Sequence, residues 1–298
     1  MTTYAIISFT DGLPADDLTA FAQRIESLAY DGLWVPELTG REPVALSSYL
    51  LAKTQTLNIG IGIANIYARD YVAAAQVRQT LTELSDGRFW LGLGVSHPVL
   101  VEPRGHVFRP PTKALGDYLR GIHSVVPDGP KLEKPAPIIC AAHGPNLLSI
   151  SRDLADGAFC LNQPPGHTAN ARKILGPDKK LCVVVRTVFE KNLKRARELA
   201  RSALDFYVKL PAYHRTWKAA GFSEQDFENG GSDRLIDAIF ALGDVESIQE
   251  RIDSHIEAGA DEICFYPVNP AEELGEDQVG GLEPDWATIE RFAPSSTS

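Results

Sequence analysis

Short apolar runs alternate with longer amphipathic stretches along the whole chain. The longer stretches, such as residues 15–32 and 244–260, place apolar residues three and four positions apart, which is typical of helices that bury one face. Strands that are apolar throughout and separated by helices predict a parallel sheet covered on both faces. The eight predicted strands are residues 4–10, 32–37, 57–65, 89–96, 137–143, 157–163, 181–190 and 262–268.

Four of the predicted joints between a helix and the next strand contain a glycine, at Gly32, Gly87, Gly157 and Gly259. Glycine suits the left-handed residue that ends a helix before the chain turns into a strand. Four similar joints in an eight-strand series favour a closed α/β barrel, a (β/α)8 TIM barrel, over a doubly wound open sheet. We therefore expect residues 1–298 to form a single domain.

Two segments are longer than simple connections require. Residues 97–111 form a proline-rich loop after the fourth strand, and residues 191–243 form a helical insertion between strands 7 and 8. Both begin at the carboxyl face of the barrel, where active sites are built, so both are candidate lids. The last residues, 295–298, are predicted to be disordered.

The charge balance limits the classes of partner. Lys and Arg total 29 against 39 Asp and Glu, a net charge of −10, which argues against a nucleic-acid or anionic-membrane surface. The amino terminus resembles neither a signal peptide nor a membrane span, so we expect a cytoplasmic protein. The expected partner is a small-molecule substrate. The four cysteines lie in apolar runs without partner spacing, which predicts buried thiols and no metal site.

The predicted strand ends are small, polar and poor in charge. No lysine ends a strand, which weakens a Schiff-base aldolase, and no His-x-His or acidic cluster supports a metal-dependent hydrolase. The GxG runs at 60–62 and 92–94 lack the third glycine of a dinucleotide fingerprint, so a Rossmann nicotinamide site is rejected. Glycine inside a strand indicates a bulge or close approach to a ligand, and these strand ends suit a flat, largely uncharged ring.

Three stretches carry a family resemblance. Residues 31–37 (DGLWVPE), 60–70 (GIGIANIYARD) and 80–98 (TLTELSDGRFWLGLGVSHP) resemble the bacterial-luciferase-like flavin and deazaflavin oxidoreductases, in the branch that uses coenzyme F420. The resemblance implies a (β/α)8 barrel, a homodimer, and hydride transfer between F420 and a small organic substrate. An FMN-dependent monooxygenase of the same superfamily and a non-catalytic flavin-binding homologue are the alternatives.

The same resemblance implies where the cofactor binds. Its members have a bulge with a non-prolyl cis peptide at the end of the third strand, behind the flavin ring, and the matching bond here is Gly62–Ile63. The end of the fourth strand would run along the ring and ribityl chain, and the turn after the fifth would receive the phosphate at a helix amino terminus. The implied cofactor-binding residues are Gly62, Ile63, Ala64, Asn65, Gly94, Val95, Ser96, Ala141, Ala142, His143, Gly144, Pro145 and Asn146.

The chain departs from the sugar-phosphate dehydrogenases of this class, which end the second strand in Asp-His, whereas Glu37-Leu38 stands here. The catalytic proton donor is therefore expected among Glu37, His97 and His106.

Two arginines are candidates to hold substrate. Arg69 has the alternative of a helix-entry ion pair, and Arg186, inside an apolar strand, must be paired or reach the barrel mouth. Aromatic residues of the insertion, Tyr207, Tyr213, His214 and Trp217, wall the substrate pocket in one interpretation and form helix core in the other.

Overall fold

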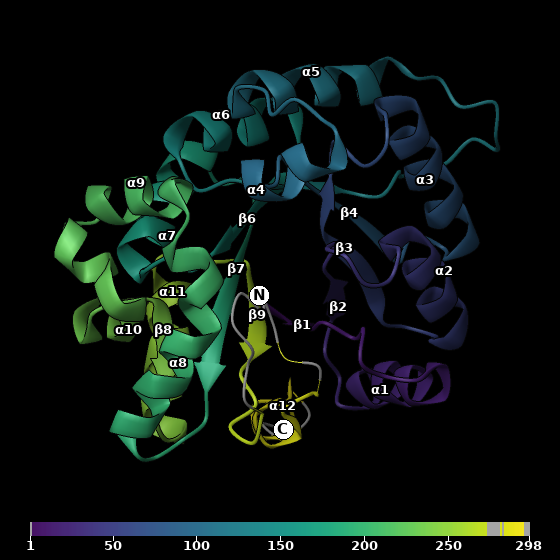
Figure 1. The fold of residues 1–298 in the computed structure, drawn as a ribbon. Coiled ribbons are helices and arrows are strands. Elements are labelled where there is room, and N and C mark those ends of the chain that lie inside the picture. Colours follow the sequence, from purple (N-terminus) through teal and green to yellow (C-terminus); the bar gives the residue numbers. More distant parts are fainter. Residues whose placement is uncertain (1, 273–280, 282, 295–298) are drawn as a thin grey trace.

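Eight parallel strands close into a barrel in this computed structural model, which describes residues 2–272, 281 and 283–294. The strands follow one another around the barrel in chain order, and the last of them, β9, pairs with both β1 and β7 (Figure 1). The predicted (β/α)8 TIM barrel is confirmed. The barrel strands are β1 (Thr3–Ile7), β2 (Gly32–Val35), β3 (Asn58–Asn65), β4 (Phe89–Gly94), β5 (Ile138–Ala141), β6 (Gly157–Leu161), β7 (Lys180–Val188) and β9 (Glu262–Pro267).

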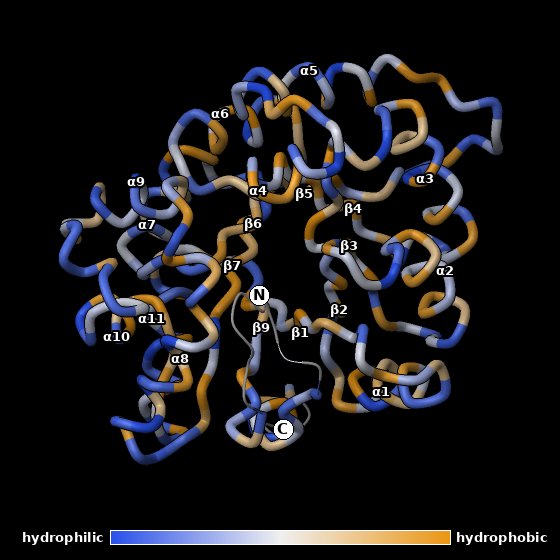
Figure 2. Tube along the Cα trace, in the orientation of Figure 1, coloured by the Kyte–Doolittle hydropathy of each residue, from blue (hydrophilic) through white to orange (hydrophobic). Residues whose placement is uncertain are grey.

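Helices surround these strands (Figure 1), and the longer ones carry both hydrophobic and hydrophilic residues (Figure 2). The first of them shows the pattern, because it buries Leu18, Phe21, Ala22 and Ile25 on one face. None of the helices in the described part of the chain is long and apolar enough to cross a membrane. The helices outside the insertion are α1 (Ala15–Ser27), α2 (Pro43–Lys53), α3 (Tyr71–Leu84), α4 (Pro98–Val101), η1 (Glu102–Arg104), α5 (Pro111–Ser124), α6 (Pro145–Leu154), α7 (Pro165–Leu175), α11 (Val245–Glu257) and α12 (Trp286–Arg291).

The insertion contains helices and one strand. The helical part comprises α8 (Leu193–Val208), α9 (Pro211–Ala219), η2 (Glu224–Gly230) and α10 (Asp233–Ile239). The strand β8 (Phe240–Leu242) pairs with the carboxyl end of β7. The prediction of eight strands therefore describes the barrel correctly but misses β8, because three residues are too few to show a strand period. The predicted disorder at 295–298 lies outside the described residues.

The glycines at the predicted joints have two different roles. Gly87 and Gly259 have positive φ angles of 83° and 100°, as predicted for helix ends. The prediction is wrong for Gly32 and Gly157, which begin strands. A Cβ on Gly32 would lie 2.7 Å from the Trp90 ring, and one on Gly157 would lie 2.2 Å from the Lys180 carbonyl oxygen. These two positions need glycine because neighbouring groups approach closely, not because of backbone angle.

The inside of the barrel is filled by large side chains above a buried carboxylate. Glu262 is completely buried at the start of β9, and its Oε1 accepts a hydrogen bond of 2.8 Å from the Trp34 indole. Its Oε2 accepts one of 2.7 Å from the Lys180 ammonium at the start of β7. Trp34 packs on Trp90 and Phe159, with ring centroids 5.3 and 5.0 Å away. This network closes the amino-terminal end of the barrel.

All four cysteines are free and buried, which confirms the prediction of buried thiols. Burial raises the pKa of each, to about 12 for Cys140 and Cys160. These thiols are therefore packing residues with little thiolate character.

Candidate functional site at the carboxyl ends of the strands

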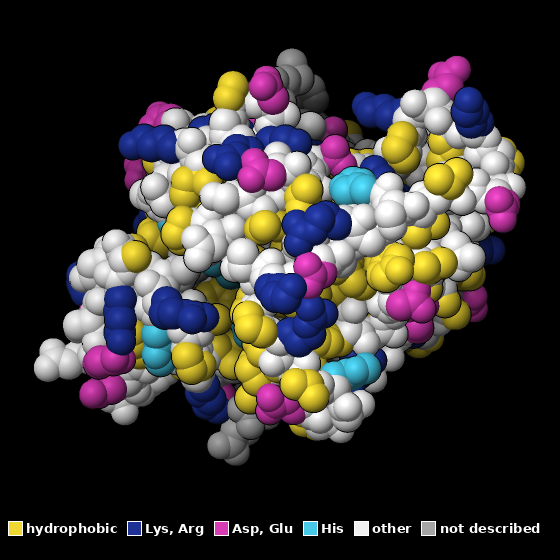
Figure 3. All heavy atoms as spheres, turned by 90° about the horizontal axis from the view of Figure 1, so that it is seen from above, with side chains coloured by type: hydrophobic (Ala, Val, Ile, Leu, Met, Phe, Trp, Pro, Cys, Tyr) yellow, Lys and Arg dark blue, Asp and Glu magenta, His cyan; other side chains and the backbone are white. Residues whose placement is uncertain are grey.

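A largely hydrophobic cavity of about 850 Å³ lies at the carboxyl ends of the barrel strands. One wall comes from the ends of β2, β3 and β4, another from the turn before α6, and a third from α8 and α9. Figure 3 shows hydrophobic side chains around a hollow, with Lys and Arg side chains on the surface beside it. Both candidate lids, 97–111 and 191–243, supply lining residues. A cavity of this size and character is typical of a small-molecule site.

The end of β3 forms a bulge against β4. Ile61 pairs with Leu91, but the next pair is Ala64 with Leu93, so Gly62 and Ile63 stand out of register. The bond between Gly62 and Ile63 is cis, as the resemblance implied, and both residues line the cavity. Ala64 is buried in the core between barrel and helices and does not line the cavity.

The end of β4 lies beside this bulge, where Val95, Ser96 and His97 line the cavity. Gly94 has a different part, because a Cβ there would lie 2.4 Å from the Ile63 Cδ1 atom. Glycine at 94 therefore leaves room for the Ile63 side chain beside β4.

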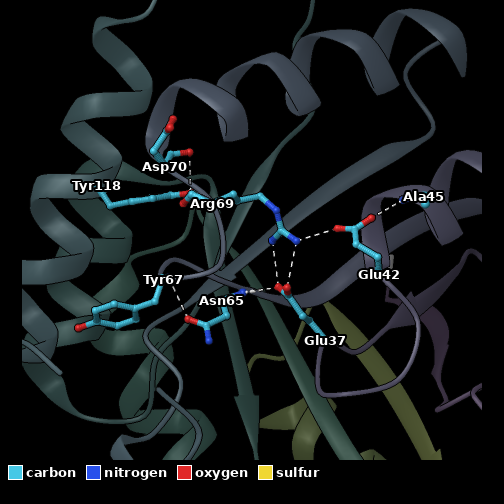
Figure 4. A network of polar contacts seen from close by, with 8 residues as sticks. All are labelled: Glu37, Glu42, Ala45, Asn65, Tyr67, Arg69, Asp70 and Tyr118. Carbon is cyan, nitrogen blue, oxygen red and sulfur yellow. Dashed lines mark hydrogen bonds and ion pairs between the residues drawn. The ribbon is translucent and has the colours of Figure 1, made fainter. Parts of the chain in front are cut away.

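Glu37 belongs to an ion-pair network that joins three elements (Figure 4). The Arg69 guanidinium donates to both of its carboxylate oxygens, at 2.9 and 3.0 Å, and the Asn65 amide donates to Oε2 at 2.7 Å. Arg69 also pairs with Glu42, at 2.8 Å, and the Glu42 carboxylate caps α2 by accepting from the Ala45 amide. Glu37 lines the cavity, but its carboxylate is the acceptor in each of these hydrogen bonds. The network therefore fixes the end of β3 against β2.

Two predicted site residues lie behind the cavity wall in this network. The Arg69 guanidinium is turned toward the two glutamates and does not line the cavity. Of the two interpretations of Arg69, the structure therefore shows the ion pair at the helix entry. Asn65 is buried, does not line the cavity, and its Oδ1 accepts a 3.0 Å hydrogen bond from the Tyr67 amide.

Of the three predicted proton donors, His97 lines the cavity and its imidazole is not engaged in a hydrogen bond or ion pair with the described residues. Its ring lies 6.1 Å from the Tyr213 ring and 6.5 Å from the Phe206 ring. Its imidazole has no hydrogen-bond partner in the described part of the chain, and burial lowers its pKa to about 4. His106, by contrast, is exposed, does not line the cavity and lies 6.0 Å from the Tyr67 ring.

The turn before α6 brings Ala141 and the stretch 143–146 to the cavity, whereas Ala142 is buried in the core. Residues lining this part are Ala141, His143, Gly144, Pro145 and Asn146. The helix has no side-chain cap, and the amides of Asn146 and Leu147 have no acceptor among the described residues. Two free N–H groups at a helix amino terminus can receive an anionic group.

Arg186 is 1% exposed and does not line the cavity. Its guanidinium lies 4.8 Å from the Tyr207 ring centroid and 4.6 Å from that of Tyr266, and it also donates to the Ala203 carbonyl. Tyr207 and Tyr266 do line the cavity, so Arg186 stands behind them.

The aromatic residues of the insertion divide between the two sequence interpretations. Tyr207 and Tyr213 line the cavity. Trp217 is core, with its indole donating to the Asn162 carbonyl at 2.8 Å, and His214 stacks on Phe227 at 4.2 Å. Hydrophobic lining residues such as Leu147 and Phe206 were not predicted, because no sequence signal distinguishes a cavity wall from core.

Buried histidines should make the protein sensitive to mild acid. Burial lowers the pKa of His97 to about 4 and those of His143 and His255 to about 3. Unfolded imidazoles titrate near pH ~6.5, so below that value the unfolded chain binds protons that the folded protein does not. We expect the free energy of unfolding to fall between about pH 6.5 and about pH 4, by at most about 1.4 kcal/mol per pH unit for each imidazole.

Urea unfolding at about pH 7.5 and about pH 5.5 measures this dependence. His255 lies outside the cavity, where its Nδ1 is 2.9 Å from the Thr168 hydroxyl, so His255→Gln should reduce the pH dependence without altering the site. Equal stability of the wild-type protein at both pH values would contradict the expectation.

Comparison with known proteins adds family evidence to this geometry. The model of the luciferase-like monooxygenase family matches residues 3–262. The 5,10-methylenetetrahydromethanopterin reductase of Methanolobus tindarius is 23% identical, over 92% of this chain and 97% of that protein. An F420-dependent secondary alcohol dehydrogenase, solved with an F420–acetone adduct, has a TM-score of 0.73 at 14% identity, over 93% of this chain and 96% of that one. The FMN-bound oxygenating constituent of 3,6-diketocamphane monooxygenase from Pseudomonas putida has a TM-score of 0.68 at 12% identity, over 99% of this chain and 97% of that one.

Proposed function

The chain belongs to the luciferase-like monooxygenase family, and from this premise we propose that it is an F420-dependent oxidoreductase, which transfers a hydride between coenzyme F420 and a small organic substrate. The choice of F420 is supported by the F420-dependent secondary alcohol dehydrogenase, whose structural similarity covers nearly the whole of both chains. A homodimer and a cytoplasmic location stay predictions from the resemblance and the sequence.

The observation that carries the proposal is the meeting of three features in one cavity. The Gly62–Ile63 segment, the end of β4 and the uncapped start of α6 come from distant parts of the chain and line the same space. A flat ring fits between hydrophobic walls and glycine-rich backbone, and an anionic tail fits the free amides. The residues present therefore suit a deazaflavin with a phosphate-bearing side chain.

Coenzyme F420, when bound, would accept a hydride from the substrate in its oxidised form or supply one in its reduced form. Gly62 and Ile63 would back the ring, Val95 and Ser96 would follow its edge, and the amides of Asn146 and Leu147 would hold the anionic tail. The hydrophobic walls from α8 and α9 would exclude water from the substrate side.

The proton that accompanies the hydride would be exchanged at the His97 imidazole. This group faces the cavity and is neutral near pH 7, because burial keeps its pKa at about 4. A neutral imidazole nitrogen can accept the proton of a substrate hydroxyl as the substrate is oxidised, and return it in the reverse reaction.

Titration with F420 and with FMN, followed by fluorescence quenching, tests the choice of cofactor. We expect F420 to bind more tightly by about 10-fold or more, which is about 1.4 kcal/mol. Oxygen consumption in the presence of each reduced cofactor provides the second measurement, and we expect none with F420. Tighter binding of FMN together with oxygen consumption would assign the protein to the monooxygenases instead.

A further inference from the structure

Two buried tyrosines line the cavity, and their hydroxyls have no hydrogen-bond partner in the part of the chain that the structure describes. Tyr207, in α8, and Tyr213, in α9, are 8% and 3% exposed, and both line the cavity. Neither hydroxyl makes a hydrogen bond within the described residues, and neither oxygen is completely shut off from solvent. A buried tyrosine hydroxyl usually has a partner, so this pair is unusual.

Four other tyrosines have a hydrogen-bond partner for their hydroxyl. The Tyr30 hydroxyl donates to the Ile289 carbonyl at 2.7 Å, and that of Tyr118 donates to the Arg69 carbonyl at 3.0 Å. The Tyr49 hydroxyl lies 2.7 Å from that of Thr19, and the Tyr67 hydroxyl accepts from the Arg109 amide at 2.8 Å. The fold supplies a hydrogen-bond partner to each of these four hydroxyls but not to the two in the cavity. We therefore expect a bound ligand to supply the acceptor for those two.

The two phenols lie together and close to His97. The rings of Tyr207 and Tyr213 meet edge to face at 5.4 Å, and the Tyr213 ring lies 6.1 Å from His97. Burial raises the pKa of both tyrosines, so each remains a protonated donor in neutral solution. A donor pair of this kind suits an oxygen atom of the substrate.

The charges around the cavity favour a neutral substrate. Among the described residues, the charged side chains that line the cavity are Glu37, Lys209 and Arg215. Glu37 is occupied by Arg69, while Lys209 and Arg215 are exposed. A charged substrate would lose its hydration without a buried counter-charge, which is costly.

We propose that Tyr207 and Tyr213 determine specificity by donating hydrogen bonds to the oxygen of a neutral, mainly apolar ketone or alcohol. The inference rests on the proposed function, because it places this oxygen beside the residue that exchanges the proton. It assigns substrate recognition to the insertion between β7 and β9, while the barrel strands and the turn before α6 hold the cofactor.

Calorimetric titration of F420-loaded protein with matched neutral ligands tests the proposal. Cyclohexanone presents a carbonyl oxygen, and methylenecyclohexane has nearly the same shape without it. The wild-type protein should bind the ketone more tightly by about 10-fold or more, and Tyr207→Phe and Tyr213→Phe should each reduce this preference by about 3- to 10-fold, as expected for one lost hydrogen bond. F420 affinity should stay within about 2-fold in both variants.

Tyr49→Phe serves as the matched control, because its hydroxyl bonds to Thr19 and it does not line the cavity, so it should keep the full ketone preference. Equal binding of the two ligands by the wild-type protein would overturn the proposal, and that measurement needs no variant to fold. Persistence of the preference in both phenylalanine variants, or tighter binding of cyclohexanecarboxylate than of cyclohexanone, would overturn it as well.

The same titration on cofactor-free protein separates this inference from the proposed function. If F420 does not bind, the cofactor assignment fails, but the ketone preference and its loss in the variants can still be measured. If F420 binds and the ketone preference is absent, only the recognition by Tyr207 and Tyr213 fails.

Discussion

Replacement of His97 by alanine is expected to slow hydride transfer by about 100-fold while changing F420 affinity by less than about 10-fold. The reason is that His97 has no hydrogen-bond partner in the described structure and faces the cavity beside Tyr213, so in the proposed function its imidazole is available to the substrate. Single-turnover measurements with a ketone or alcohol that the wild-type protein converts would give the rate, and fluorescence quenching would give the affinity.

Glu37→Gln is the informative comparison, because Glu37 was also predicted as a proton donor. Its carboxylate accepts hydrogen bonds from Arg69 and from the Asn65 amide, so the substitution should weaken the support of β3. We expect it to lower F420 affinity and thermal stability more than it lowers the rate at saturating cofactor. The reverse pattern, with a rate loss in Glu37→Gln and none in His97→Ala, would assign the proton to Glu37.

Glu262→Ala is expected to destabilise the fold by about 3 kcal/mol, because it leaves a buried indole N–H without an acceptor, breaks an ion pair and opens a cavity. Glu262 is fully buried and accepts from both the Trp34 indole and the Lys180 ammonium. Trp34 in turn occupies the space beside Gly60 and Gly62, so its displacement would disturb the floor of the cavity. Urea unfolding at neutral pH would measure the loss.

Glu290→Ala provides the control for this prediction, since Glu290 pairs with Arg24 where both side chains are about half exposed. A surface pair contributes at most about 1 kcal/mol, so this variant should unfold almost as the wild-type protein does. A similar, small loss in both variants would show that the buried network does not stabilise the barrel.

The barrel itself was predictable from the sequence because its signals are local. Apolar runs of six to ten residues and amphipathic stretches between them report which residues are covered, and that pattern identifies a parallel sheet wrapped in helices. The bulge at Gly62–Ile63 was predictable for a different reason, namely the resemblance of residues 60–70 to a known family. The short strand β8 escaped because three residues carry too little pattern.

The sequence also located the strand ends that line the cavity but could not assign roles to their side chains. Glu37 and Arg69 are 32 residues apart, and nothing in their local sequence says that they form a bidentate pair. Their pairing depends on β2 and β3 lying side by side in register, which is a property of the closed barrel. The same holds for Arg186, whose position behind Tyr207 and Tyr266 depends on how α8 packs on β7 and β9.

The sequence by itself therefore determined the fold class and the residue types available for chemistry, because periodicity acts on neighbouring residues, whereas the bulge followed from the family resemblance of residues 60–70. Only the tertiary structure decided which of these side chains remain available to a ligand in the cavity. It uses Glu37 and Arg69 to hold the chain, turns His106 to the surface, and leaves His97, Tyr207 and Tyr213 facing one cavity. The physical reason is that hydrogen-bond partners and burial are set by contacts between distant segments, which no local pattern records.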